Sequence, residues 1–309
     1  MVSFRGGQKC PPRAFEQRSK NLMDEKQIGS ISVTRGLLAA KKMTPNKKLG
    51  QNFLVDGEVL QKIAAAVNPQ KGELIIEIGA GLGALSQVLA QSGAPLLLLE
   101  IDAGAAAHLS EYFKDKPNVK VVCADALSFD FAAAQAAYAY TACKLVSNLP
   151  YHLTSQLTER LLRVADWSQL VLMMQKEAAE RLLAQPDQRG YGPLSLEIAY
   201  RGEAELLFKV ASGSFYPPPA VTSAVIRISK RAYPLKPTDE KLLFSLIKAA
   251  FALKRKTLFN SLSANFKMDK KQLQAALQQA GLDGRRRAEN LALPEFIALS
   301  EAVLAGQQQ

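Results

Sequence analysis

The sequence of 309 residues has only three cysteines, two histidines and one tryptophan, and it lacks any long apolar run. Cys10, Cys123 and Cys143 are odd in number and widely spaced, which argues against a disulfide framework and against secretion. With so few cysteines and histidines, a zinc site is not expected. No apolar stretch reaches the ~18 residues that a membrane span requires. We therefore predict a cytoplasmic protein that holds no metal and does not enter a membrane.

Acidic residues are too few to balance the basic ones: 28 Asp and Glu stand against 39 Lys and Arg, a formal net charge of +11. The excess lies at the two ends. Residues 1–48 hold 11 basic and 3 acidic side chains and residues 227–287 hold 15 and 4, whereas residues 49–226 hold 13 and 18. A strongly basic surface usually binds nucleic acid or an anionic membrane. The distribution predicts that such a partner contacts the ends of the chain.

The first 22 residues are basic and have no apolar core, so they do not resemble a secretory signal. A transit peptide would show the same charge. We favour a leader without fixed structure, or a natural start at Met23.

Short apolar runs alternate with helical stretches from Lys71 onward, which predicts a parallel sheet covered by helices on both faces. The expected strands are Leu74–Ile78, Leu96–Ile101, Val119–Cys123, Lys144–Ser147 and Leu170–Met174. The expected helices are Ala84–Gln91, Gly104–Phe113, Thr154–Val164 and Glu177–Leu183. Two later runs, Glu205–Val210 and Ala224–Ile228, suit an antiparallel edge. The predicted fold class is α/β, with a doubly wound, mostly parallel sheet.

Only helices are expected after the turn-rich segment Tyr233–Pro237. Their predicted ranges are Glu240–Leu253, Lys256–Phe266, Lys270–Ala280 and Pro294–Leu304. The last range begins with proline, which the first turn of a helix tolerates. We therefore divide the chain into a partly disordered N-terminal extension (1–43), a sheet-containing domain (44–232) and an all-helical domain (233–309).

A glycine-rich loop follows the first strand, where backbone amides face a ligand and Gly79 and Gly81 allow its close approach. Glu100 ends the next strand, where a carboxylate can accept hydrogen bonds from ribose hydroxyls. The pattern also satisfies the dinucleotide fingerprint, which leaves an NAD dehydrogenase open. Glu77, just before the loop, instead favours a ligand with a cationic head such as S-adenosylmethionine. Asp125, after the third strand, can then bind the adenine amino group.

Asn148, Leu149, Pro150 and Tyr151 follow the fourth strand, at the edge where open α/β sheets bind ligands. These residue types suit methyl transfer to an adenine amine, whose lone pair is delocalised into the ring. The Asn148 side-chain oxygen and the Leu149 carbonyl can each accept an N–H bond and so aim the lone pair at the methyl group. Pro150 fixes the direction of that carbonyl, and Tyr151 can stack on a flipped base. A sulfonium donor is already activated, so no metal is required.

Together these motifs resemble the small-subunit ribosomal RNA adenine dimethyltransferases, the KsgA type, and more loosely the large-subunit methylases that confer macrolide resistance. The resemblance runs from about Lys47 to the C-terminus. It implies a Rossmann-like class I methyltransferase domain and S-adenosylmethionine as cofactor. The implied reaction places two methyl groups on N6 of each of two adjacent adenines near the 3′ end of small-subunit (16S) ribosomal RNA. The implied partner is a partly assembled 30S-type particle, met by a monomeric enzyme during ribosome biogenesis.

The resemblance also assigns residues to roles. It implies that Gln51, Asn52 and Leu54 help to close over the cofactor, and that Phe215 packs against the target base. The other implied cofactor contacts are Glu77, Gly79, Gly81, Glu100, Asp125 and Asn148.

Three positions depart from the pattern that the family usually shows. His152 stands where an amide or an aromatic residue is more frequent, and we interpret it as a helix-start residue and not as a catalytic base. Ala220 and Thr222 stand where Lys and Asp are frequent, so the preference for the target base is less firmly predicted than cofactor binding.

Basic residues recur throughout the helical domain, with a net charge of +11 over residues 227–287. A single basic run is usually a solvated helix face, but this recurrence favours a phosphate-binding surface, and an amphipathic membrane helix is not evident. The residues assigned to RNA binding are Lys254, Arg255, Lys256, Arg285, Arg286 and Arg287. A large-subunit methylase and a non-catalytic assembly or transcription factor remain alternatives. The first would modify naked large-subunit RNA, and the second would not need an intact Asn148–Tyr151.

Overall fold

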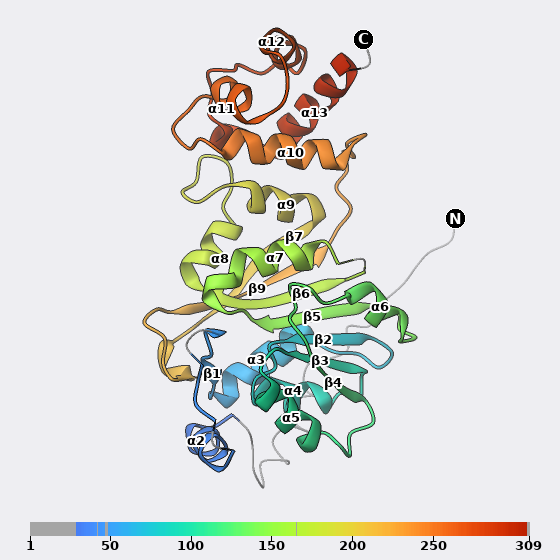
Figure 1. Ribbon diagram of the computed structural model, residues 1–309, viewed down its shortest axis with the longest axis vertical. Helices are drawn as coiled ribbons and strands as arrows, with labels where there is room; N and C mark the ends of the chain where they lie inside the picture. Colours follow the sequence, from blue (N-terminus) through green and yellow to red (C-terminus); the bar gives the residue numbers. More distant parts are fainter. Residues whose placement is uncertain (1–28, 42, 47–48, 165, 308–309) are drawn as a thin grey trace, which may run out of the picture.

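The computed structural model describes residues 29–41, 43–46, 49–164 and 166–307 (Figure 1). Its main sheet has seven strands in the order β4-β3-β2-β5-β6-β9-β7. The strands are β2 Leu74–Ile78, β3 Leu96–Glu100, β4 Val119–Cys123, β5 Cys143–Asn148, β6 Gln169–Gln175, β7 Gly202–Val210 and β9 Ser223–Lys230. Strands β2 to β6 are parallel to one another, and β9 and β7 add an antiparallel edge. The predicted fold class is therefore confirmed.

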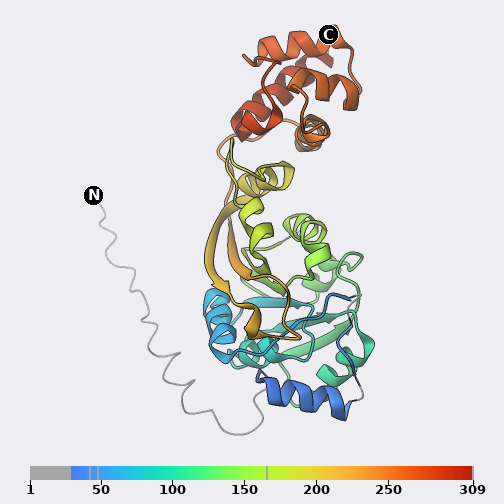
Figure 2. The ribbon, with the colours of Figure 1, turned by 90° about the vertical axis from the view of Figure 1, so that its left-hand side faces the viewer.

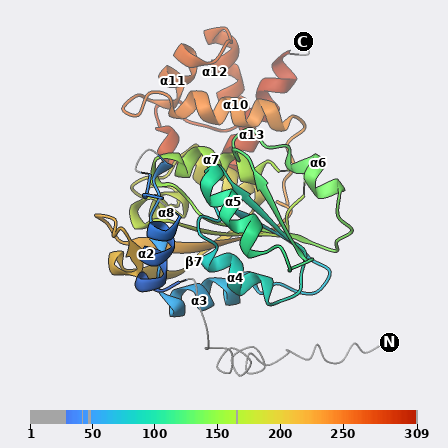
Figure 3. The same cartoon turned by 60° about the horizontal axis from the view of Figure 1, so that its bottom comes forward.

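Helices cover both faces of this sheet because its strands are apolar on both sides. In β2, Leu74 and Ile76 pack on one face and Ile75 on the other. The first face is covered by α6 Phe131–Ala136, α7 Thr154–Leu162 and α8 Lys176–Leu182. The second face is covered by α3 Gly57–Val67, α4 Ala84–Ala90 and α5 Ala103–Tyr112, which Figure 3 shows in front.

The C-terminal helices enclose a core of their own at one end of the molecule (Figures 1 and 2). They are α10 Glu240–Phe251, α11 Leu258–Asn265, α12 Lys270–Gln279 and α13 Leu293–Gln307. As predicted, a proline lies in the first turn of the last helix. Helix α9, Pro193–Arg201, joins this end to the sheet, since its Leu196 belongs to the helical core and its Ile198 to the sheet core.

The extension ahead of residue 44 is not wholly without order. Helix α2, Ile31–Ala40, buries Thr34 and Leu38. Leu38 packs with Phe53 and Leu82 in a small cluster beside the glycine loop. The expectation of a leader at residues 1–22 and of a start at Met23 lies outside the described residues.

A second, two-stranded sheet joins segments that are far apart in the chain. Strand β1, Phe53–Leu54, pairs antiparallel with β8, Phe215–Tyr216. This sheet, helix α2 and helices α3, α6 and α9 were not among the predicted elements. Among the described residues, no helix has the length and apolar character needed to cross a bilayer.

Candidate active site

The candidate active site is a pocket that lies where the strand order of the sheet reverses. Strands β3 and β4 extend the sheet on one side of β2, and β5 and β6 extend it on the other. Open α/β sheets bind ligands at the carboxyl edge of such a switch point. There Ser147 of β5 donates a hydrogen bond of 2.8 Å to the carbonyl oxygen of Ile78 in β2. The glycine loop and Asn148 therefore begin side by side.

Glycine is needed at different positions of the loop for different physical reasons. Gly79, Gly81 and Gly83 all have positive φ, at 72°, 57° and 87°. A Cβ atom at Gly83 would lie 2.8 Å from Leu109 of α5, so this glycine allows the helices to pack. A Cβ atom at Gly79 would meet no described atom within 4 Å. The loop is thus tight on its helix side and open toward the pocket.

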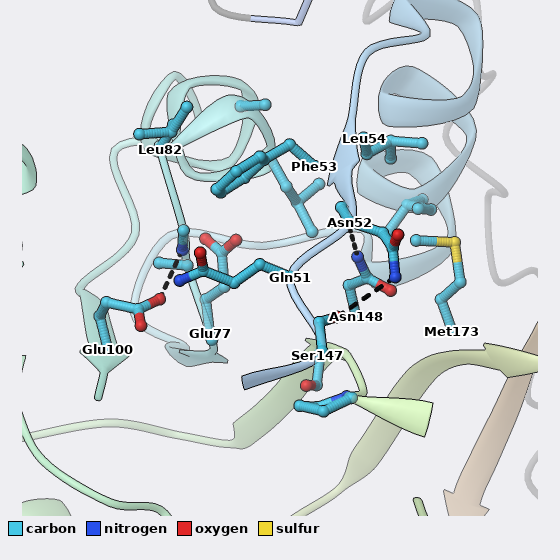
Figure 4. A pocket seen from close by; sticks show the side chains of 18 of the residues that line it. Gln51, Asn52, Phe53, Leu54, Glu77, Leu82, Glu100, Ser147, Asn148 and Met173 are labelled. Atoms are coloured by element: carbon cyan, nitrogen blue, oxygen red, sulfur yellow. Dashed lines mark hydrogen bonds between the residues drawn. The ribbon is translucent and has the colours of Figure 1, made fainter. Parts of the chain in front are cut away.

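Glu100 holds the glycine loop from the end of β3. Its Oε2 accepts a hydrogen bond of 2.7 Å from the Gly81 amide (Figure 4). Its Oε1 accepts one of 2.9 Å from the Asp102 amide. Burial raises the pKa of this carboxyl, while the two amides lower it. Each carboxylate oxygen can accept a second bond, so ribose hydroxyls remain possible partners.

Glu77 is the most strongly perturbed acid of the pocket. It is 4% exposed and accepts a hydrogen bond of 2.6 Å from the Ser86 hydroxyl. Burial raises its pKa to about 8, and the nearby Glu100 adds to the rise. No basic side chain of the described chain forms an ion pair with either carboxyl. Two buried, unpaired acids make this pocket suited to a ligand that brings positive charge.

The amide of Asn148 has a fixed orientation. Its Nδ2 donates a hydrogen bond of 3.1 Å to the carbonyl oxygen of Asn52, as Figure 4 shows. The side chain of Asn52 in turn donates to the Gly50 carbonyl, at 3.2 Å. Because the donor half of the Asn148 amide is engaged, its Oδ1 is the half left to accept a bond from a ligand.

The next three residues are also held firmly. The Leu149 amide donates to the Met173 carbonyl at 2.9 Å, and its side chain is buried. Pro150 has φ −57° and ψ 129°. A proline also restricts the backbone of the residue before it, which limits the directions open to the Leu149 carbonyl. Tyr151 opens a short 3₁₀ helix, η2 Tyr151–Leu153, and is partly exposed.

Most of the residues predicted for catalysis and cofactor binding line one pocket, with side chains from α2, β1, the glycine loop, β3 and β5 (Figure 4). The predicted residues among them are Gln51, Asn52, Leu54, Glu77, Gly79, Gly81, Glu100, Asn148 and Pro150. Sequence reasoning missed Thr34, Ser147 and Met173, which line it too. Ser147 adjoins the tetrapeptide and was accessible to the same reasoning, whereas no motif marked Thr34 or Met173.

Two predicted residues lie elsewhere than expected. Asp125 is exposed, and its Oδ1 accepts a hydrogen bond from the Leu127 amide, the local turn that an Asp after a strand often makes. Phe215 is 2% exposed because β8 pairs with β1 and turns its ring into the sheet core. Its ring therefore does not face the pocket in this structure.

The cations assigned to RNA binding fall into two groups. Lys254, Arg255 and Lys256 are exposed in the turn between α10 and α11. The arginines that follow α12 are instead each paired with an acid: Arg285 with Asp283, Arg286 with Glu295 and Arg287 with Glu289. Arg286 also donates to the carbonyl oxygen of Asn290, so both of these partners lie within the helical region.

Comparison with known proteins decides the family. The family model described as Ribosomal RNA adenine dimethylase matches residues 42–303. The chain belongs to this family. A relative from Pelotomaculum thermopropionicum, named Ribosomal RNA small subunit methyltransferase A, is 38% identical over 295 residues, which cover 91% of this chain and 99% of that one. A relative of the same name from Desulfitobacterium hafniense is 41% identical over 260 residues, which cover 84% and 92% of the two chains.

Solved structures have the same architecture. The crystal structure of the 23S rRNA methyltransferase ErmE matches with a TM-score of 0.61 and 26% identity, covering 82% of this chain and 99% of that one. A dimethyladenosine transferase from Plasmodium falciparum matches with a TM-score of 0.67 and 23% identity, covering 80% and 95%, and so supports the fold alone. Like the rest of the adenine dimethylase family, this chain is an S-adenosylmethionine-dependent methyltransferase, as predicted. The alternative of an NAD dehydrogenase is therefore excluded.

Proposed function

We propose that this adenine dimethylase transfers methyl groups from S-adenosylmethionine to N6 of two adjacent adenines near the 3′ end of small-subunit ribosomal RNA, two methyl groups to each. The observation that carries the proposal is the fixed amide of Asn148, with Oδ1 left as acceptor beside a pocket of buried acids. The small-subunit target rests on the names of the relatives that match nearly the whole chain.

The cofactor fits the charge and shape of the pocket. Glu77 would face the cationic end of S-adenosylmethionine, and the open space at Gly79 would admit it. Glu100 would accept from the ribose while it holds the Gly81 amide. When bound, the cofactor supplies an activated methyl group on a sulfonium. Asp125 remains a candidate for its adenine, because only one of its carboxylate oxygens is engaged by Leu127.

The target adenine would be activated by acceptors and not by a strong base. Asn148 Oδ1 and the Leu149 carbonyl would accept the two N–H bonds of the amine and hold its lone pair toward the methyl group. Tyr151 would stack on the flipped base. In the conformation described, Phe215 lies behind β1 and would support this site through packing.

We place the RNA on the exposed Lys254, Arg255 and Lys256 and on the outer faces of Arg285 and Arg287. A basic module beside a catalytic pocket suits structured RNA, which proteins read through shape and backbone. The proposed setting is a partly assembled 30S-type particle in the cytoplasm, met by a monomer that uses no metal. The proposed division into a catalytic domain, residues 44–232, and an RNA-binding domain, residues 233–309, follows the separate cores.

Labelled methyl transfer tests the proposal directly. The purified chain is incubated with labelled S-adenosylmethionine and either small subunits that lack the modification or naked large-subunit RNA. We expect N6,N6-dimethyladenine at two adjacent positions of the small-subunit RNA and none in the large-subunit RNA. Label in the large-subunit RNA alone would indicate the resistance-type activity. Absence of label from both, with cofactor bound, would indicate a non-catalytic factor.

A further inference from the structure

The hydroxyl of Tyr151 meets a serine from a distant part of the chain. Tyr151 Oη lies 2.8 Å from Oγ of Ser223, and the two hydroxyls share a hydrogen bond. Ser223 is 0% exposed, while Tyr151 is partly exposed beside the pocket. A fully buried hydroxyl needs a partner, and here the partner is the hydroxyl of Tyr151, which directly follows the pocket residue Pro150.

Ser223 is a rigid anchor. It begins β9, where it stands opposite Gln175 of β6 and Val210 of β7. The residue before it, Thr222, accepts a hydrogen bond of 3.0 Å from the Lys176 amide. The backbone of Ser223 is thus held by a strand that is paired on both sides, which leaves rotation about χ1 as the one freedom of its hydroxyl.

The other end of Tyr151 is held as well. The hydroxyl of Thr154 lies 3.2 Å from the Tyr151 carbonyl oxygen and 3.3 Å from the Pro150 carbonyl oxygen. The Leu153 amide also donates to Pro150, at 3.0 Å. A tyrosine side chain has two rotatable bonds, and its Oη lies on the axis of the second, so holding the backbone and the hydroxyl fixes the direction in which the ring extends.

We propose that Ser223 is a positioning residue for the methyl transfer: through its bond to the Tyr151 hydroxyl it holds the ring in the position at which the target adenine stacks. The inference rests on the proposed function and deepens it. Neither residue lines the cofactor pocket. Loss of the bond therefore slows transfer to RNA and leaves the cofactor affinity unchanged.

A double-mutant cycle tests this positioning role. Ser223→Ala, Tyr151→Phe and the double variant are compared with the original chain in kcat for labelled transfer, in cofactor affinity by calorimetry and in Tm. Each single variant is expected to lower kcat about three- to tenfold, the range of one neutral hydrogen bond. The double variant is expected to lose no more than either single one, because both remove the same bond. Ser195→Ala is the matched control, since it removes another buried serine hydrogen bond, to the Arg181 carbonyl.

A second readout follows the stacking itself. RNA with 2-aminopurine at the target position is expected to lose fluorescence on binding, and to lose less of it with Ser223→Ala. Additive losses of kcat, or losses as large for Ser195→Ala, would overturn the positioning role while transfer by the original chain still stands. No transfer by the original chain would overturn the proposed function and this inference with it.

Discussion

The pocket of the sheet and the C-terminal helices differ in the sign and the burial of their charged side chains. In the pocket, Glu77 and Glu100 are both 4% exposed, and neither forms an ion pair within the described chain. In the helical region the cations lie at the surface: the Arg285 side chain is 90% exposed, and Lys254 to Lys256 are exposed in a turn. The pocket thus buries carboxyl groups that have no ion-pair partner, whereas the helical region exposes basic side chains.

We propose that this difference keeps two ligands of opposite charge apart. A buried, unpaired carboxyl is costly, and it is best relieved by a cation that enters the pocket. An exposed lysine costs little and suits a polyanion that binds through many weak contacts. Under the proposed function, the cofactor is drawn to the pocket and the RNA to the helical region, although the whole chain carries +11. The predictions below test each side of this contrast.

The largest effect is expected at Asn148. In Asn148→Asp a carboxylate replaces the amide donor and faces the Asn52 carbonyl oxygen, so two acceptors oppose each other and the side chain turns away. We expect the single-turnover rate of methyl transfer to fall by about 100- to 1,000-fold, as when a fixed polar group of an active site is lost. Cofactor affinity, measured by calorimetry, should not fall, because the added carboxylate lies in a pocket that receives a cation.

The matched control for Asn148 is Glu100→Ala, which frees the Gly81 and Asp102 amides and should weaken cofactor binding first. If Asn148→Asp lost cofactor affinity and Glu100→Ala kept it, the two roles would be exchanged.

The next effect concerns the stability of the pocket. The raised pKa of Glu77 means that the folded state holds its proton more tightly than the unfolded state does. This contribution is complete below the ordinary value of 4.5 and is lost as the pH rises to about 8. Glu77→Gln, which keeps an acceptor for Ser86, should remove up to about 1.4 kcal/mol per pH unit of that slope. Urea unfolding from pH 5 to 9 measures it.

The same variant should bind the cofactor less well, because it lacks the charge that S-adenosylmethionine would meet. For the original chain, cofactor affinity should rise about tenfold between pH 7 and 9, since a cation in the pocket must displace the Glu77 proton. Glu58→Gln, on a side chain that is 88% exposed, is the control. A Glu77→Gln variant with the original pH profile would show that this acid does not face the cofactor.

These effects concern residues that the sequence marked well. The five parallel strands are mostly apolar, and the glycine loop, Glu100 and Asn148 all lie at strand ends, so their meeting at one edge was predictable. Helix α3 was missed although Asp56 caps it and Val59, Leu60 and Ile63 face the core, a pattern that the chain does display.

Other features had no local signal. Strands β1 and β8 have two residues each and pair across the whole sheet domain, so only the folded chain reveals that Phe215 is buried by Leu54. The pairing of Arg286 with Glu295 likewise arises from the packing of a loop against α13. From composition alone, the three arginines at 285 to 287 and the cations at 254 to 256 look alike.

That last contrast within the helical region gives the smallest effect. Replacing Lys254, Arg255 and Lys256 together by Gln should weaken RNA binding about tenfold at 0.1 M salt and reduce its salt slope by about 2 to 3, because phosphate contacts release counterions. The Tm should not change, since these side chains are exposed.

Arg286→Gln should instead keep the RNA affinity and lower the free energy of unfolding by about 1 kcal/mol, because it loses Glu295 and the Asn290 carbonyl. Filter binding over a salt series, with urea unfolding of the same samples, separates the two. If Arg286→Gln lost RNA affinity and kept its full stability, Arg286 would again be assigned to the RNA-binding surface.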